Sequence, residues 1–281
     1  MVDLLLKAFL GLVGIVALVG LGTWWLGNQQ PSKAIQAHST VIFVALRSSD
    51  LTSPKLLTQN HDDVLWRGKS LHALIGPEET YWTEFALLPT GTDRLDGWNN
   101  SPSIDDIYAA EVSLTPLPSF VLGLLRGLHL LGIKQRPTGA LPDSMADVSA
   151  RQDVMPTDVS TQKMIDLSPE TEITMINFLA YKPSENGSTS EGRSTYNQYG
   201  LEAIKAVHQV GGQFLFAGRI KEVLLDSEKA PTAGAWDDLA AMIYPDPTAI
   251  FYMEQIPAYT AALNYRDEAL ERTVVIASER H

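Results

Sequence analysis

The chain contains no cysteine among its 281 residues. Disulfide bridges, thiolate metal ligands and a cysteine nucleophile are therefore all excluded. A basic surface is missing as well, because 21 Lys and Arg residues stand against 33 Asp and Glu residues, a net charge of −12 at pH 7. Most of this excess lies in residues 141–281, which carry 11 basic and 21 acidic side chains. Such a surface repels phosphate backbones, so we expect no nucleic acid partner.

The familiar motifs of metal, nucleotide and hydrolase sites are also missing. The histidines, at positions 38, 61, 72, 129, 208 and 281, show no His-x-His or His-x-x-x-His spacing, so we predict no metal site. No Gly-x-Gly-x-x-Gly, P-loop or Gly-x-Ser-x-Gly segment occurs, which removes the usual signatures of dinucleotide, phosphate and acyl-transfer sites. We therefore expect no cofactor, and the catalytic residues stay unknown at this stage.

One long hydrophobic run, residues 4–26, has Lys7 as its only charge and ends at Trp24 and Trp25. As a helix with 1.5 Å per residue it would span about 34 Å, enough to cross a bilayer core of ~30 Å. Indole rings favour the membrane interface, and no small-x-small cleavage site follows them. We predict a transmembrane anchor in residues 1–30, with the lipid bilayer as partner of residues 4–26. The protein would be a single-pass membrane protein with its remaining part on the non-cytoplasmic (periplasmic) side; a cleaved signal peptide is the alternative.

Residues 38–135 are predicted to form a degenerate ferredoxin-like domain. The apolar residues 40–46 fit a buried strand, and residues 71–75 and 81–88 fit a strand pair. Ser101 and Pro102 predict the cap and first turn of a helix. Residues 120–133 are nearly all apolar but too short to span a bilayer, which leaves a buried core helix or an interfacial helix. Residues 136–160 contain Pro, Gly, Asp and Ser and are predicted to be a linker.

Residues 161–281 begin with a strand–helix–strand pattern. Residues 174–179 and 213–218 fit the two strands. The helix between them ends at Gly211, which suits a left-handed terminating residue. A further helix is predicted from Pro247, with Asp246 as its cap and an interruption or kink at Pro257. One face of the first helix carries the apolar and aromatic residues Tyr196, Tyr199, Ala203, Val207 and Val210.

Several short elements of this second segment recur in a family-like order. They are Gly192-Arg193, Tyr196-x-x-Tyr199-Gly200, Gly211-Gly212, Trp236-Asp237-Asp238 and Tyr244-Pro245. Through them, residues 155–278 resemble the family called domain of unknown function 1330, of the dimeric α/β-barrel superfamily. The resemblance implies a ferredoxin-like βαββαβ unit whose sheet pairs with a second copy to enclose a barrel. It implies no settled activity, since some barrels of this superfamily are oxygenases or isomerases and others bind haem.

The first segment repeats the order of features of the second. Residues 40–46, 71–76 and 81–86 correspond to residues 174–179, 213–218 and 235–240. A ferredoxin-like sheet of this superfamily exposes one face that needs a partner, and a degenerate copy in the same chain would supply it. We therefore predict an α+β fold with two ferredoxin-like units of the dimeric α/β-barrel type in tandem, 38–135 and 161–281, after one transmembrane helix. This arrangement is an intramolecular pseudo-dimer; a homodimer formed by the second unit is the alternative.

The candidate ligand-binding residues are polar and aromatic side chains near the start of the first helix and on the strands. Phenols and a guanidinium can bind a carboxylate or orient a small aromatic ligand. We predict small-ligand binding or a structural role for a membrane-anchored protein. The alternatives are an oxygenase- or isomerase-like enzyme that uses the barrel cavity, and an accessory subunit of a membrane complex that docks through residues 120–133. The candidates are Asn177, Arg193, Tyr196, Tyr199, Arg219 and Trp236.

Overall fold

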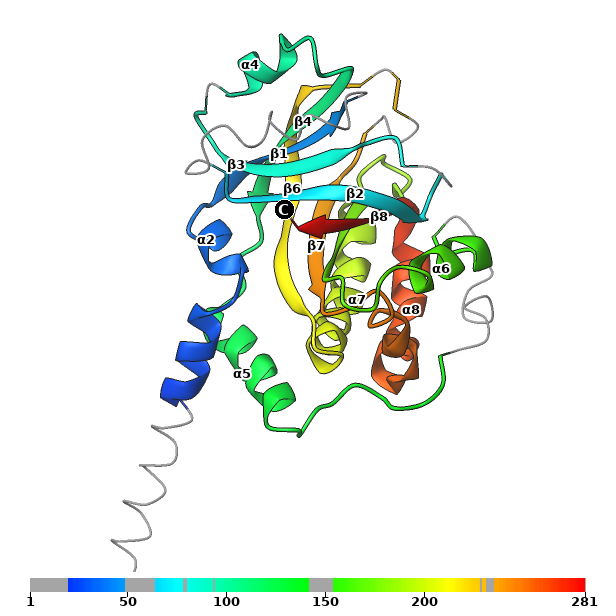
Figure 1. Ribbon diagram of the computed structural model, residues 1–281. Helices are drawn as coiled ribbons and strands as arrows, with labels where there is room; N and C mark the ends of the chain where they lie inside the picture. The colour runs from blue at the N-terminus through cyan, green and yellow to red at the C-terminus, as the bar shows by residue number, and fades with distance from the viewer. Residues whose placement is uncertain are drawn as a thin grey trace, which may run out of the picture.

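Eight antiparallel strands close into one barrel, with helices on its outside (Figure 1). This computed structural model describes residues 20–48, 64–77, 80–92, 94–141, 154–227, 229–230 and 235–280. The strands are β1 (Thr40–Arg47), β2 (Trp66–Ile75), β3 (Glu84–Pro89), β4 (Asp106–Leu114), β5 (Ile173–Tyr181), β6 (Gln213–Leu225), β7 (Asp238–Tyr244) and β8 (Leu270–Arg280). The α+β class predicted from the sequence is confirmed.

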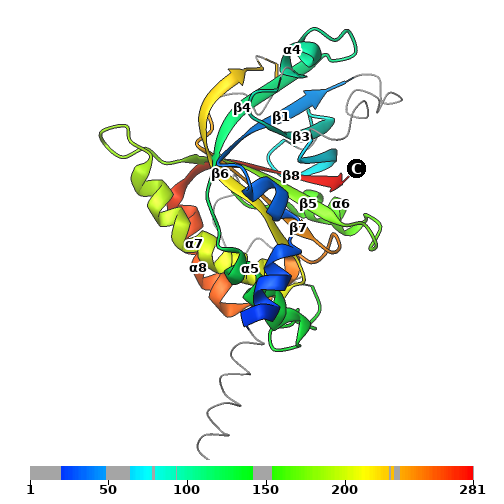
Figure 2. The same cartoon turned by 90° about the vertical axis from the view of Figure 1, so that its left-hand side faces the viewer.

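The helices differ greatly in length and in what they cover. Residues 20–28 are helical and are followed by the short α2 (Ser32–Gln36). The other elements are α4 (Arg94–Asn99), α5 (Ser119–Leu130), α6 (Asp158–Ile165), α7 (Ser190–Gln209), the 3₁₀ helix η2 (Phe251–Gln255) and α8 (Pro257–Ala269). Figure 2 shows α7 and α8 side by side on one outer face of the barrel.

The strand order around the barrel is β1-β3-β2-β8-β5-β7-β6-β4. Strands β1 to β4 are therefore contiguous in the order β4-β1-β3-β2, and strands β5 to β8 follow the same relative order, β8-β5-β7-β6. Two seams join these halves: β2 pairs with β8, and β4 pairs with β6. Both seams are antiparallel and lie within one chain, so no sheet edge is left unpaired in the barrel.

The barrel interior is filled by apolar side chains. Alternate residues of each strand point inward because side chains alternate across a strand. Phe43 of β1 lies at the centre, with the rings of Phe85, Phe178 and Phe216 at centroid distances of 6.0, 5.6 and 6.5 Å. These four rings are at least 99% buried. The interior therefore acts as the main core of the molecule and binds its two halves together.

The outer face of each half is covered differently. On the first half, Trp98 of α4 packs over a small cluster that includes Ile42, Val44 and Leu88. On the second half, α7 and α8 cover β5, β7 and β6 with the apolar residues Ala203, Val207 and Leu263. The helix face predicted for α7 is confirmed, and Gly211 ends it with φ +91°. The larger helix layer lies over the second half, which is where the candidate site is found.

Two local predictions were wrong. Pro102 starts no helix: residues 106–114 form β4, in which Tyr108, Ala110 and Val112 point into the barrel with the period of two that defines a strand. The interruption predicted at Pro257 is present: η2 ends at Gln255, and Pro257 occupies the first position of α8, where its missing N–H costs nothing. The helix expected from Pro247 is replaced by a turn and η2.

The prediction of a single-pass membrane protein with a periplasmic part is corrected. Among the residues that the structure describes, no helix combines the length and the apolarity needed to cross a bilayer. Within the predicted span, residues 4–19 lie outside the described ranges, and residues 20–26 belong to the helix that packs on α5 (Figures 1 and 2). This contact is close, since a Cβ on Gly123 would meet the backbone oxygen of Thr23 at 1.8 Å.

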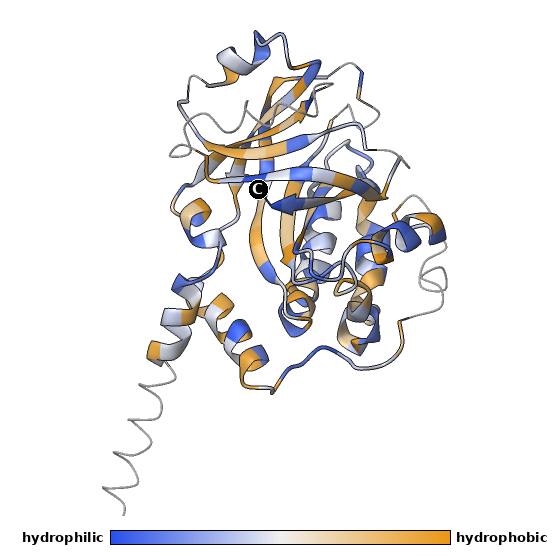
Figure 3. Cartoon of the chain, viewed as in Figure 1, coloured by the Kyte–Doolittle hydropathy of each residue, from blue (hydrophilic) through white to orange (hydrophobic). Residues whose placement is uncertain are grey.

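Helix α5 is neither a core helix nor free of contacts. Only Leu122, Gly123 and Gly127 are buried, while Phe120 is 60% exposed. Figure 3 shows hydrophobic residues both on α5 and on the helix of residues 20–28 that packs against it. Arg126 donates from Nη1 to the backbone oxygen of Gly211 at 3.0 Å, which holds α5 at the end of α7. Its apolar composition is thus explained only in part by burial.

Candidate functional site: a cavity between the sheet and two helices

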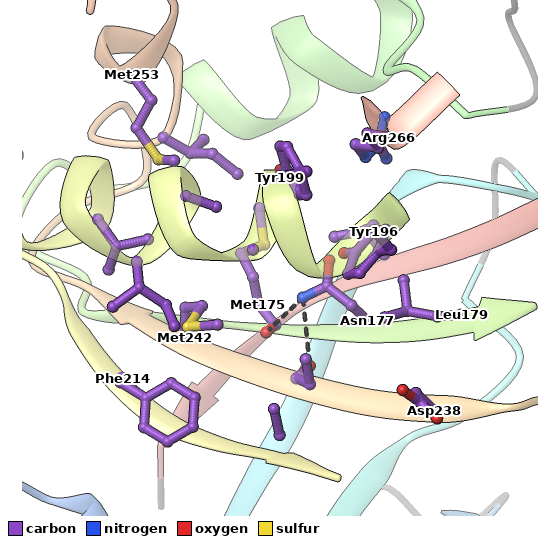
Figure 4. A pocket seen from close by; sticks show the side chains of 18 of the residues that line it. Met175, Asn177, Leu179, Tyr196, Tyr199, Phe214, Asp238, Met242, Met253 and Arg266 are labelled. Atoms are coloured by element: carbon purple, nitrogen blue, oxygen red, sulfur yellow. Dashed lines mark hydrogen bonds between the residues drawn. The ribbon is translucent and has the colours of Figure 1, made fainter. Parts of the chain in front are cut away.

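The alternation of β5 and β7 divides their side chains between the barrel and the helix layer. Ile176 and Phe178 of β5 point into the barrel core, whereas Met175, Asn177 and Leu179 point toward the helices. On β7, Ala240 and Met242 take the helix side in the same way. These residues form the floor of a cavity roofed by α7 and α8 (Figure 4).

The cavity has a volume of about 370 Å³. Its lining is mostly apolar and includes four methionines: Met175 and Met242 on the sheet, Met253 on η2 and Met155 before α6. Pockets for small molecules typically have volumes of ~300–1,000 Å³ and combine apolar walls with a few polar groups. The polar residues that line this cavity are Thr115, Asn177, Tyr181, Tyr196, Asn197, Tyr199, Asp238, Tyr244, Glu254, Tyr259 and Arg266.

Three of the tyrosines form a row of mutually tilted rings along the roof. Tyr199 lies between Tyr196 and Tyr259, with ring centroids 5.2 and 5.8 Å apart, and its hydroxyl is 3.3 Å from that of Tyr259. Burial raises the pKa of both Tyr196 and Tyr259 well above the usual value. Both phenols therefore stay protonated at neutral pH and can donate a hydrogen bond. Across the described ranges, no side chain or backbone group accepts from the hydroxyl of Tyr196.

Asn177 lies in the floor beneath these rings. Its Nδ2 donates to the backbone oxygens of Met175 and Ala240, at 3.2 and 3.3 Å. These bonds fix the amide in one orientation, with its oxygen on the side of α7 (Figure 4). The sequence-predicted residues Asn177, Tyr196 and Tyr199 are thus brought together at one cavity.

Arg193 lies beside the cavity and is engaged by the protein. Its guanidinium pairs with Asp238, with Nη2 and Nε donating to Oδ1 at 2.9 and 3.1 Å, and Asp237 is 3.6 Å from Nη2. The hydroxyl of Tyr181 donates to Asp238 at 2.9 Å, and burial raises the pKa of this phenol far above its usual value. The carboxylate of Asp238, which borders the cavity, is consequently neutralised by a cation and a hydrogen-bond donor.

Arg219 and Trp236 lie away from the cavity. Arg219 is exposed on β6. Trp236 is buried in the barrel core, 5.6 Å from the ring of Phe178, and the guanidinium of Arg272 lies 4.1 Å above its ring. The structure therefore separates the six sequence-predicted residues into three that line one cavity and three that do not.

Two charged residues of the cavity were missed at the level of the sequence. Glu254 of η2 lines it, and burial raises the pKa of its carboxyl to about 7. Arg266 of α8 lines it too and is only 6% exposed. Tyr259 and Arg266 are seven residues apart, a spacing that places both on one helix face, and this was the signal available in the sequence. Within the described ranges, no cluster of three or more His, Asp or Glu side chains is arranged to hold a metal.

Comparisons with known proteins give similarity in structure only. No family model matches the chain, and no curated protein matches it. A protein of unknown function from Rhodopseudomonas palustris is 23% identical, with 44% of this chain and 93% of that protein covered and a TM-score of 0.37. A proposed monooxygenase from Lactobacillus acidophilus is 7% identical over 86% of this chain and 94% of its own, with a TM-score of 0.44.

A second proposed monooxygenase, from Fusobacterium nucleatum, is 10% identical over 86% of this chain and 92% of its own, with a TM-score of 0.42. At these identities and TM-scores, the likeness carries no argument about function.

Proposed function

We propose that this chain is a small-molecule-binding protein whose ligand occupies the cavity between the sheet and helices α7 and α8. The observation that carries this proposal is the cavity of about 370 Å³ between the sheet and the helix layer, on the opposite side of the sheet from the aromatic barrel core. This volume lies in the range of pockets that take small molecules, ~300–1,000 Å³, and its walls are mostly apolar.

A purely structural role is less well supported. It would be favoured by a cavity filled with Phe, Leu and Met side chains, and such filling is found inside the barrel, around Phe43, but not under α7. The unpartnered phenol of Tyr196 and the fixed amide of Asn177 add specific polar contacts to apolar walls. This combination is typical of a ligand pocket.

The proposal is tested with N-phenyl-1-naphthylamine, a neutral apolar dye whose fluorescence rises on leaving water. We expect saturable binding by the full chain. Ala203→Leu fills the roof of the cavity and should weaken the dye's affinity at least tenfold, whereas the matched variant Ala261→Leu changes an exposed residue of α8 and should leave it unaltered. Equal affinities in all three proteins would contradict the proposal. If the dye binds as expected, native mass spectrometry of the purified protein would identify a natural ligand by its mass.

An isomerase-like enzyme is the second candidate, and Glu254 is the observation that favours it. Its carboxyl borders the cavity with a pKa of about 7, a value suited to a group that takes up and returns a proton near neutral pH. Solvent deuterium incorporation into the ligand found by mass spectrometry would test this role. Exchange catalysed by the wild type and lost in Glu254→Gln supports an enzyme; no exchange supports binding alone.

The repeated strand order supports a proposal about the fold. We infer that β1 to β4 and β5 to β8 are two ferredoxin-like units, the first degenerate, joined as a pseudo-dimer within one chain. The division into residues 38–135 and 161–281, and the resemblance of residues 155–278 to domain of unknown function 1330, stay predictions. Their support is the common order of strands and the full βαββαβ sequence of the second half.

A further inference from the structure

Arg266 is a buried cation in the cavity wall without an acidic partner. It is 6% exposed. Its Nη1 donates to the backbone oxygen of Val154 and lies 3.4 Å from Sδ of Met155. Across the ranges that the structure describes, no carboxylate comes within 4.0 Å of its guanidinium. A buried charge is normally paired, since an unpaired one costs several kcal/mol.

The groups around Arg266 leave room for an external anion. One of the two acids in the cavity wall, Asp238, is already held by Arg193 and Tyr181. Glu254 stands before the first turn of α8, whereas Arg266 stands in its last turn, so the two charges occupy opposite ends of the helix. Arg266 therefore supplies the only guanidinium among the cavity-lining residues that the structure describes.

A second donor lies at the same end of the cavity. Figure 4 shows Tyr196 beneath Arg266, and the Tyr196 hydroxyl has no acceptor within the described part of the chain. A guanidinium and a phenol together present hydrogen-bond donors to one region, as binding sites for carboxylate or sulfonate groups do. Beyond them, the walls are apolar and include Met175, Met242 and Leu263.

We propose that the ligand of this cavity is an apolar molecule with one anionic group, a carboxylate or a group of similar size and charge, which Arg266 and Tyr196 bind. This inference rests on the proposed binding function and adds the chemical class of the ligand. The anionic group would take the place of the missing acidic partner of Arg266, and the apolar body would fill the space toward Met253.

Two dyes that differ in a single group test the proposal. 1-Anilinonaphthalene-8-sulfonate has the same rings as N-phenyl-1-naphthylamine and adds one sulfonate. Hydrogen bonds to a charged group contribute about 1.5–3 kcal/mol, so the wild type should bind the sulfonate roughly ten- to a hundredfold more tightly than the neutral dye. Only the binding that Ala203→Leu removes is counted, because exposed apolar residues of α5 can also take up dye.

The variant Arg266→Gln should lose this preference, with the sulfonate weakened at least tenfold and the neutral dye within about threefold of the wild type. Arg266→Lys keeps the charge and should retain a clear preference for the sulfonate. Arg219→Gln, which removes an exposed arginine outside the cavity, is the matched control and should change neither affinity. Circular dichroism establishes that each variant is folded.

The outcomes separate the two proposals. If the neutral dye binds in the cavity but the sulfonate binds no better, or if Arg266→Gln affects both dyes equally, the anionic ligand is refuted and the binding function stands. If neither dye shows a component that Ala203→Leu removes, the binding function fails as well. Should Arg266→Gln not fold, Tyr196→Phe decides: a selective loss of sulfonate affinity supports the proposal, and unchanged affinity for the sulfonate overturns it.

Discussion

The guanidinium groups of Arg193 and Arg266 lie at the same end of the second half of the barrel. They differ in the groups that surround them. Arg193 has two carboxylates within 4.0 Å and is bound by one of them in a fork. Arg266 has a carbonyl and a thioether sulfur as its partners. Because both residues are arginines, the difference between their partners comes from tertiary contacts and not from residue type. This difference supports the proposal that Arg266, and not Arg193, binds the ligand.

Arg193→Gln should therefore destabilise the protein and leave ligand affinity unchanged. The substitution removes a partly buried, bidentate ion pair and leaves Asp238 with the hydroxyl of Tyr181 alone. We expect a loss of about 1–3 kcal/mol in the free energy of unfolding, measured by urea denaturation at pH 7. Arg219→Gln serves as the control. A tenfold weaker dye affinity with unchanged stability would instead make Arg193 a ligand-binding residue.

Glu254 should make stability depend on pH in a direction opposite to that of a paired carboxylate. Burial raises its pKa from 4.5 to about 7, so the folded state holds a proton that the unfolded chain releases between these values. The stabilisation that the protonated Glu254 carboxyl gives to the folded state is complete below pH 4.5. This stabilisation is lost as the pH rises to about 7.

Glu254→Gln removes this loss. The variant should match the wild type at pH 4 and exceed its unfolding free energy by roughly 1–2 kcal/mol at pH 8, after allowance for the partial exposure of the carboxyl. Urea denaturation of both proteins across this pH range gives the difference directly. A constant difference at all pH values would mean that Glu254 has the same pKa in the folded and the unfolded protein and that burial does not perturb its carboxyl.

At the scale of single elements, the sequence predicted those that have a clear period and missed those decided by neighbours. The face of α7 and the strands β1, β5 and β6 follow from apolar spacing. The helix expected at Pro102 failed because Tyr108 and its alternate neighbours are drawn into a barrel core that no local pattern reveals. The cavity could not be predicted from the sequence for the same reason. Its existence depends on which side chains of the roof are too small to fill the space above the sheet.

Arg136 anchors the described part of the crossover between the halves, residues 134–141, to the second half. Its Nη1 donates to Oδ2 of Asp246 at 2.5 Å, its Nη2 donates to Oγ1 of Thr248 at 2.7 Å, and its guanidinium lies 4.1 Å above the ring of Tyr252. Burial by itself would raise the pKa of Asp246, but the hydrogen bonds from Arg136 and Thr248 outweigh it and hold the pKa below its usual value.

Arg136→Gln should release this segment. We expect faster protease cleavage within residues 134–141 and a loss of about 1 kcal/mol in the free energy of unfolding at pH 7. The loss should shrink as the pH falls below 3.8, because the unfolded and then the folded Asp246 become protonated and the ion pair no longer contributes. Limited proteolysis and urea denaturation at pH 7 and pH 3 measure both effects. Unchanged cleavage would place the restraint elsewhere, for instance at Gln209 or Gln255, which also bind this segment.

At the scale of the whole molecule, the sequence predicted the α+β fold class and the barrel. It did not predict which strands pair at the two seams between the halves. The two strand patterns indicated two similar sheets, but which edges meet depends on pairing between residues more than a hundred positions apart. Lys69 pairs with Glu279 across one seam, and Glu111 pairs with Glu222 across the other. Because both seams are closed by one chain, the barrel needs no second copy.

This closure can be tested with cysteines, because the chain has none of its own. Lys69→Cys with Glu279→Cys places two thiols on directly opposed, exposed residues of β2 and β8, at a separation that a disulfide can bridge. Under mild oxidation we expect a disulfide within one chain, seen as a monomer of unchanged mass that migrates faster on non-reducing gels. The pair Glu111→Cys and Glu222→Cys should behave alike at the second seam, and Lys69→Cys alone should remain monomeric. Covalent dimers formed by both pairs but not by the single variant would show that the halves pair between chains, and the barrel would then have to be redrawn as an assembly of two molecules.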